Sequence, residues 1–101
     1  GSLIDVVVDI RKNSTTYGQF ITVELSGNNA KGVYLPTGTA HGFYVKEDNT
    51  CMVYLTSTVH SPTNDGGIRY DSFGFDWPTK NGIHSERDIL FPTLADFNTP
   101  F

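Results

Sequence analysis

Residues 34–43 read YLPTGTAHGF, and this stretch says more about the fold than any other part of the chain. Its Pro-Thr-Gly turn leads directly into Ala40-His41-Gly42-Phe43. A turn followed by a small residue, a histidine, a glycine and an aromatic can aim one imidazole from the start of a strand into a pocket. His41 is therefore a candidate ligand contact. The alternative is a histidine at a strand start whose ring is satisfied by backbone groups.

The segments around this stretch are typical of short strands separated by turns. Residues 3–10 read LIDVVVDI, and successive side chains of a strand point to opposite faces. One face should be core, because all of its residues are apolar: Ile4, Val6, Val8 and Ile10. The other face carries Asp5 and Asp9, so it should meet water, a cleft or a charged partner.

Further strands are expected at residues 19–25, 32–35, 41–45 and 51–58, and shorter extended pieces at 68–70 and 74–77. One helical turn, capped by Ser85, is expected at 85–88. No segment shows a sustained apolar period of 3.6, so the fold class is all-β, a sandwich or a barrel. The 101 residues are enough for one small domain, expected over 3–101, and Gly1-Ser2 resembles the remnant of a removed tag.

Composition and charge exclude several classes of protein. Hydrophobic residues make up 38% of the chain and aromatics 13%, which excludes compositional disorder. Seven basic against eleven acidic residues give a net charge of -4, so no nucleic-acid partner is expected. No apolar run reaches the roughly 18–20 residues of a membrane span. Cys51 is the only cysteine, which excludes an intrachain disulfide and fits a reducing cytoplasm.

Two residues outside the AHGF stretch are candidates for chemistry, each beside a plainer interpretation. Tyr54 lies within an expected strand and is either a packing residue or a phenol that protonates a carbanion. Asp88 follows Ser85 by three residues, so it either belongs to a helix cap or orients a catalytic histidine. The three histidines lie far apart in the chain and form no His-x-His pair, so no metal site is expected.

Taken in order, a series of segments resembles the dTDP-4-dehydrorhamnose 3,5-epimerase family of nucleotide-sugar epimerases. These segments are DVVVDIRKNSTTYGQF, VELS, LPTGTAHGF, VYLTSTVHSP, GIRYDSFGFDWP and SERD. Each motif alone is modest, but their order and spacing match the family from Ile4 to about Leu94. The resemblance implies a cupin, a jelly roll of antiparallel strands that is dimeric and uses no metal or other cofactor.

The resemblance also implies a reaction and the residues that carry it. In this family a histidine base removes a proton next to the ketone of a dTDP-4-keto-6-deoxy sugar, and a tyrosine returns a proton to the other face. Tyr54 matches that tyrosine, and Asp88 matches the aspartate that orients the base. His41 and Asp5 match pocket positions, and His60 stands where the family has a second pocket tyrosine.

Several features of the family are not found within these 101 residues. The family's base lies in an Arg-Gly-Leu-His segment well before the DIRK strand, and neither that segment nor the lysine that holds the enolate occurs here. Tyr70 replaces a tryptophan, and Leu55 replaces a lysine. We therefore expect an N-terminally incomplete jelly roll with an open sheet edge and exposed apolar surface. Such surfaces favour a homodimer or a strand-exchanged oligomer.

Three functional interpretations follow. The first is a nucleotide-sugar epimerase of deoxysugar biosynthesis, or part of one, whose base comes from another segment, another chain or His60. The second is a catalytically inactive cupin that binds a sugar or serves as an oligomerisation module. The third is a fragment that folds only by oligomerising and binds no ligand.

Overall fold

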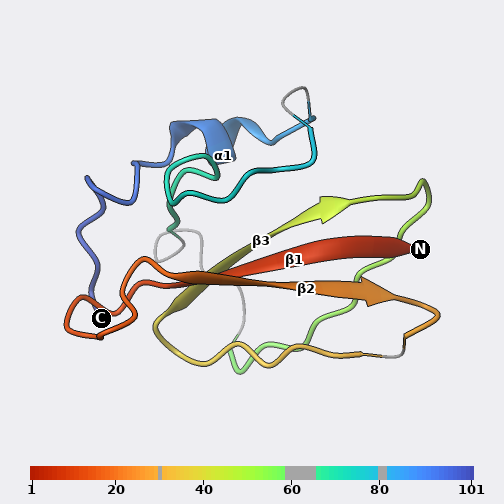
Figure 1. Cartoon of the computed structure of the whole chain (residues 1–101), viewed down its shortest axis with the longest axis horizontal. Coiled ribbons are helices and arrows are strands. Elements are labelled where there is room, and N and C mark those ends of the chain that lie inside the picture. Colours follow the sequence, from red (N-terminus) through yellow and green to blue (C-terminus); the bar gives the residue numbers. More distant parts are fainter. Residues whose placement is uncertain (30, 59–65, 80–81) are drawn as a thin grey trace.

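The computed structural model describes residues 1–29, 31–58, 66–79 and 82–101. These residues form a three-stranded antiparallel sheet and one short helix (Figure 1). The strands are β1 (Ser2–Asp9), β2 (Phe20–Ser26) and β3 (Thr39–Val45), in the spatial order β2-β1-β3. The helix α1 (Glu86–Leu90) lies above the strands in the view of Figure 1, within the C-terminal segment of the described residues (66–79 and 82–101), whose end descends to the level of the sheet. The expected all-β antiparallel class is confirmed.

β1 is the central strand, and both of its faces are buried. Val6 and Val8 are 1% and 2% exposed and Ile10 is buried too, so these residues of the face predicted as core are in the core, whereas Ile4 is only half-buried. The opposite face is equally covered, because Asp5 is 1% exposed and Asp9 is 9% exposed. This face was expected to meet water, a cleft or a charged partner, and its burial excludes bulk water. Each carboxylate therefore needs a hydrogen-bond partner within the protein.

The register of β1 against β3 places the histidine of the AHGF stretch on the face that carries the carboxylates. His41 lies opposite Val7, and Asp5 lies opposite Phe43. Residues on directly opposed and diagonal positions share one face of a sheet, so Asp5 and His41 are diagonal neighbours across the two strands. β3 begins just after Gly38, whose φ of 91° is a conformation that glycine adopts without strain.

Two of the expected strands are not strands in the part of the chain that the structure describes. Residues 32–35 and 51–58 belong to no sheet, and the pieces at 68–70 and 74–77 are also unpaired. A segment becomes a strand only when its backbone is hydrogen-bonded to a neighbouring strand. The alternation of apolar and polar residues in the sequence does not show whether such a neighbour is present. Val53 and Leu55 are 83% and 97% exposed, so the apolar side chains of that segment are uncovered.

An aromatic cluster joins the C-terminal segment to the sheet. Phe20 of β2 makes edge-to-face contacts with Phe73 and Phe75, at centroid distances of 5.7 and 5.5 Å. Phe75 in turn contacts Trp77, at 4.7 Å. The indole N–H of Trp77 donates to the backbone oxygen of Tyr70 at 2.8 Å. Contacts of this kind add to the energy of area burial and fix the segment in place.

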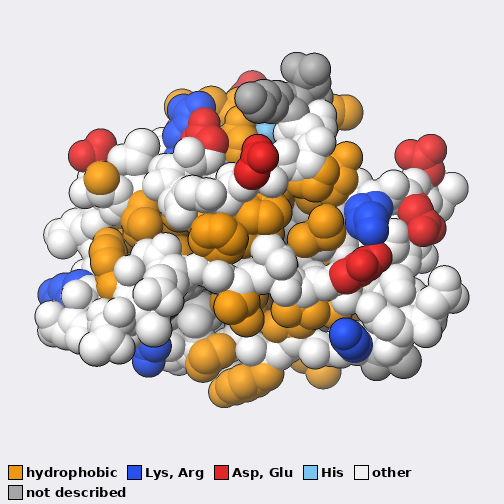
Figure 2. Space-filling model, in the orientation of Figure 1, with side chains coloured by type: hydrophobic (Ala, Val, Ile, Leu, Met, Phe, Trp, Pro, Cys, Tyr) orange, Lys and Arg blue, Asp and Glu red, His pale blue; other side chains and the backbone are white. Residues whose placement is uncertain are grey.

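Hydrophobic side chains also remain at the surface, as expected for an open sheet. Figure 2 shows them gathered across the middle of the visible face and along its lower rim. The most exposed include Tyr34 at 87% and Ile83 at 103%, besides Val53 and Leu55. Contiguous apolar surface of this kind is uncommon on a monomer and marks contact sites. Among the described residues there is no helix of the length and apolarity needed to span a membrane.

The contrast between two valines tests this account of the core. Val6→Ala should lower the free energy of unfolding by about 2 kcal/mol, because it removes two methyl groups from a fully packed position. Val53→Ala makes the same change at a side chain that is 83% exposed, and it should shift stability by less than about 0.5 kcal/mol. Urea unfolding measures both values. Equal losses would contradict the placement of the core on β1.

Candidate functional site

A cavity of about 850 Å³ runs along β3. The successive residues 39–44 all line it. Val6 and Val8 of β1 line it as well, so the cavity extends from β3 over the neighbouring central strand. No strand of the described residues pairs with the outer edge of β3. Further walls come from the C-terminal segment: Tyr70, Phe73, Trp77, His84, Ser85, Arg87 and Asp88.

The cavity brings together three of the residues that the sequence singles out. His41 of β3, Tyr54 and Asp88 all line it, although 47 positions of sequence separate His41 from Asp88. Asp5 does not line the cavity, but its carboxylate is hydrogen-bonded to His41, which does. His60 lies outside the described residues, so its expected place in the pocket stays a prediction. The roles of these residues are likewise predictions.

Asp5 and His41 form the one pair of expected site residues with a hydrogen bond between them in the described structure. Oδ1 of Asp5 lies 3.3 Å from Nδ1 of His41. The Asp5 side chain is 2% exposed and that of His41 is 35% exposed, so the carboxylate is inside and the ring extends outward. A carboxylate only accepts hydrogen bonds, so the ring nitrogen facing it is the donor.

Tyr54 and Asp88 differ in their surroundings. Tyr54 is 71% exposed within the unpaired segment 51–58, which leaves its phenol open to solvent and ligand. Asp88 is half-buried in the first turn of α1. The backbone N–H of Asp88 donates to Oγ of Ser85 at 3.2 Å, so the predicted Ser85 cap is confirmed. Capping thus uses the backbone of Asp88, and this bond leaves its carboxylate available to the cavity.

The structure adds aromatic residues that were not among the expected site residues. The rings of Tyr70 and His84 stack at 4.3 Å with an interplanar angle of 22°. Trp77 meets Tyr70 edge-on at 6.2 Å. These residues are separated by turns and belong to no periodic pattern, so only the three-dimensional arrangement shows that they form one wall. Flat aromatic surfaces of this kind suit the apolar faces of sugars and bases.

No cluster of three or more His, Cys, Asp or Glu side chains in the described parts of the chain is arranged to hold a metal ion. The expectation of a site without metal stays a prediction.

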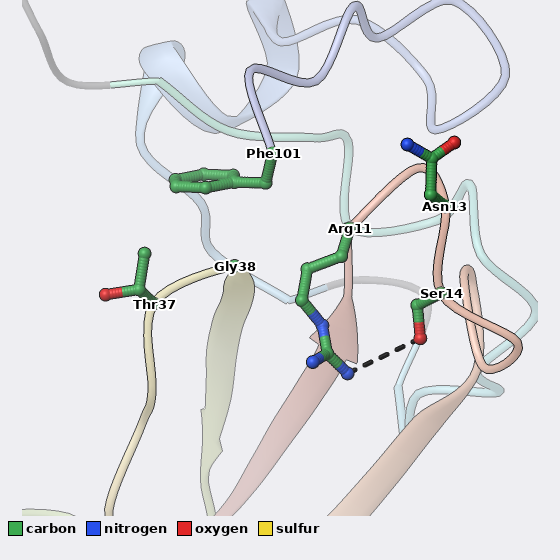
Figure 3. A pocket seen from close by; sticks show the side chains of 6 residues that line it. All are labelled: Arg11, Asn13, Ser14, Thr37, Gly38 and Phe101. Atoms are coloured by element: carbon green, nitrogen blue, oxygen red, sulfur yellow. Dashed lines mark hydrogen bonds between the residues drawn. The ribbon is translucent and has the colours of Figure 1, made fainter.

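A second, smaller cavity of about 440 Å³ lies where the loop after β1 meets the start of β3 (Figure 3). Arg11 is the cationic residue in its lining, and its charge is already engaged. Its Nε and Nη2 each donate to the carboxylate of Asp9 at 3.0 Å, and Nη2 also contacts Oγ of Ser14 at 3.4 Å. A guanidinium held in this way fixes the loop. It is poorly placed to attract an anionic ligand, so the cavity along β3 is the better candidate site.

A comparison with known proteins adds the family. A family model described as dTDP-4-dehydrorhamnose 3,5-epimerase matches residues 1–96. The chain belongs to the dTDP-4-dehydrorhamnose 3,5-epimerase family. Curated members from Shigella flexneri and Methanothermobacter thermautotrophicus are each 40% identical to it, over 95% of its length. The alignments cover 54% and 55% of those proteins, so the chain spans about half the length of the curated relatives it matches.

Solved structures of the epimerase family share the fold. The 3,5-epimerase of Legionella pneumophila, in complex with dTDP-4-keto-L-rhamnose, matches with a TM-score of 0.79 at 31% identity, over 97% of this chain and 54% of that one. A 3'-monoepimerase from Streptomyces bikiniensis, in complex with dTDP-quinovose, matches with a TM-score of 0.89 at 33% identity, over 94% of this chain and 50% of that one. The cupin-type fold predicted from the motifs is confirmed.

Acidification tests the carboxylate at the end of β1. Hydrogen bonds from the side chains of Arg11 and then Thr16 hold the pKa of Asp9 far below its usual value. A lowered folded-state pKa contributes stability that is fully present above the unfolded-state pKa of about 3.9 and is lost as the pH falls below it. Asp9→Asn should therefore be less stable than the wild type at neutral pH, and the difference should shrink on acidification.

The measurement is the midpoint of thermal unfolding between about pH 7 and pH 2.5. Asp48→Asn removes the same charge from an exposed loop position, and it should follow the wild-type curve. Parallel curves for Asp9→Asn and the wild type would show that the Asp9 network does not stabilise the fold.

Proposed function

We propose that this chain takes part in the epimerisation of a dTDP-4-keto-6-deoxy sugar, as a step in deoxysugar biosynthesis such as that of rhamnose. The observation that carries the proposal is the cavity along β3, in which His41, Tyr54 and Asp88 of an epimerase-family chain come together. Relatives in complex with dTDP-4-keto-L-rhamnose and dTDP-quinovose support a nucleotide sugar as the ligand. The single exposed Cys51 fits a reducing cytoplasm as the site of action.

The chemistry rests on the acidity of carbons next to a ketone. A base takes the proton from such a carbon, and the C–H electron pair moves into the enolate. The phenol of Tyr54 then gives its proton to the opposite face of that carbon, which inverts it, and solvent reprotonates the phenolate. Asp88 acts as the carboxylate that orients a histidine, while His41, His60 and Asp5 contribute to substrate binding.

Proton exchange in deuterated water tests this function directly. The chain is incubated with dTDP-4-keto-6-deoxyglucose, and NMR follows the protons on C3 and C5. Deuterium should enter at one or both positions faster than without protein, and which positions exchange separates a 3-epimerase from a 3,5-epimerase. Binding without any exchange above background would exclude catalysis.

Replacement of one tyrosine tests the proton donor. Tyr54→Phe should reduce inversion at C5 by roughly 10²- to 10⁴-fold, because a general acid is lost, while proton removal at C3 should persist. Tyr34→Phe is the matched control, since Tyr34 is 87% exposed and lies outside the cavity lining. Equal losses of exchange and inversion in Tyr54→Phe would contradict the role of proton donor.

A binding module without catalysis is the second candidate, and one observation favours it. His60 stands where the family has a second pocket tyrosine, so the sequence of this chain departs from the family's pattern at an expected site residue. Isothermal titration with the same nucleotide sugar separates the candidates when combined with the exchange experiment. Saturable binding with no exchange supports the module, and no binding supports a fragment without a ligand.

Self-association is a further part of the proposal. The exposed apolar side chains, and the edge of β3 that pairs with no strand of the described residues, are surfaces that another copy of the chain would cover, by dimer formation or strand exchange. Light scattering coupled to size exclusion should therefore report a mass of at least twice 11.2 kDa. A mass of a single chain at all concentrations tested would exclude this assembly.

A further inference from the structure

The helix α1 is too small to hold its own position. It has five residues, none of which is buried, and Ile89 and Leu90 are 46% and 81% exposed. A helix this short is unstable in isolation and normally depends on the packing of an apolar face, which α1 lacks. Hydrogen bonds at its two ends therefore matter more than packing. Ser85 accepts one at the start of the helix, and the far end is bonded to a different part of the chain.

Arg69 makes the bond at the far end. Its Nη1 donates to the backbone oxygen of Ile89 at 3.3 Å, across 20 positions of sequence. The rest of the guanidinium is held by Asp71, whose carboxylate accepts from Nε at 2.8 Å and from Nη2 at 3.4 Å. Because the guanidinium is planar and its donors have fixed directions, the pairing with Asp71 aims Nη1 at the helix.

Further hydrogen bonds join the surroundings of Arg69 to the residues that follow α1. The backbone N–H of Arg69 donates to the backbone oxygen of Pro92 at 2.7 Å. Oγ of Ser72 donates to the backbone oxygen of Arg69 at 2.6 Å and accepts from the N–H of Leu94 at 3.0 Å. The segment around Arg69 and the segment after α1 therefore form one hydrogen-bonded unit.

Both parts of this unit border the cavity along β3, but Arg69 does not. Tyr70, the neighbour of Arg69 in sequence, lines the cavity, and so does Asp88, the neighbour of Ile89. Arg69 is absent from the lining, and its side chain is 36% exposed. Its effect on a ligand must therefore pass through the residues that it holds in place, and the nearest of these on α1 is Asp88.

We propose that Arg69 is a positioning residue that anchors α1, and with it the carboxylate of Asp88, in the wall of the cavity. The inference rests on the proposed function, in which Asp88 orients a histidine. Reactions of this kind depend on exact placement, and a displacement of about 1 Å can cost roughly 10²-fold in rate. Asp71 completes the arrangement because it orients the guanidinium.

The anchoring of α1 is measured without any ligand, by ¹⁵N relaxation of its backbone amides. Their order parameters should be about 0.85 in the wild type, as in rigid backbone, and should fall below about 0.6 in Arg69→Met. Arg69→Lys keeps a charge opposite Asp71 but has no second nitrogen for the oxygen of Ile89, so it should loosen α1 as well. Lys46→Met is the matched control, because it breaks an ion pair of similar exposure at the sheet, and it should leave α1 unchanged.

Low order parameters of α1 in the wild type, or wild-type values in Arg69→Met, overturn the anchoring whatever the activity. If the methionine variant does not fold, the lysine variant decides the question in the same way.

A double-mutant cycle tests whether the anchoring acts through Asp88. Deuterium exchange at C3 and C5 of the nucleotide sugar should be roughly 10- to 10²-fold slower in Arg69→Met than in the wild type. Asp88→Asn should also be slower, and the double variant should be no slower than Asp88→Asn alone. A residue that acts through another adds nothing once the other is removed, whereas independent losses multiply.

Losses that multiply, or exchange by Arg69→Met at the wild-type rate, overturn the positioning role and leave the epimerase function intact. Absence of exchange in the wild type removes the proposed function, and the order parameters still decide whether Arg69 anchors α1.

Discussion

The burial of β1 on both faces is the constraint on which the rest of the structure depends. This strand pairs with β2 on one side and β3 on the other, and all of its residues except the half-buried Ile4 are buried. Its apolar residues form the centre of the core. Its two carboxylates, Asp5 and Asp9, are buried with them, and each then requires a partner at a definite position. Those partners organise the loop after β1 and the candidate site.

The two carboxylates are satisfied in different ways. Asp9 is held by Arg11 and Thr16 from the loop that follows it, so its bonds are local and close the turn between β1 and β2. Asp5 is bonded to His41 from a different strand, and that ring borders the cavity. The bonds of Asp9 therefore stabilise a loop, whereas the bond of Asp5 joins the central strand to a residue that lines the cavity.

The sequence predicts those parts of the fold that are determined by neighbouring residues. Alternation identifies β1, and the Pro-Thr-Gly turn before Ala40 identifies the start of β3, because both signals are local. The segment 51–58 has the same alternation but no strand partner in the described structure, and pairing is a property of two segments rather than one. The same contrast between local and long-range determinants holds for the candidate site. The motifs indicate His41, Tyr54 and Asp88, but the bond from Asp5 and the Tyr70–His84 stack depend on register and on loop paths that no local pattern encodes.

Native-state amide hydrogen exchange tests the central role of β1 most directly. Amides that open only by global unfolding exchange slowest, and the account predicts that these are the amides of β1, with faster exchange in β2 and β3 and rapid exchange across residues 51–58. Protection of residues 51–58 equal to that of β1 would contradict the account, because it would show that this segment is a paired strand and that the sheet extends beyond β3.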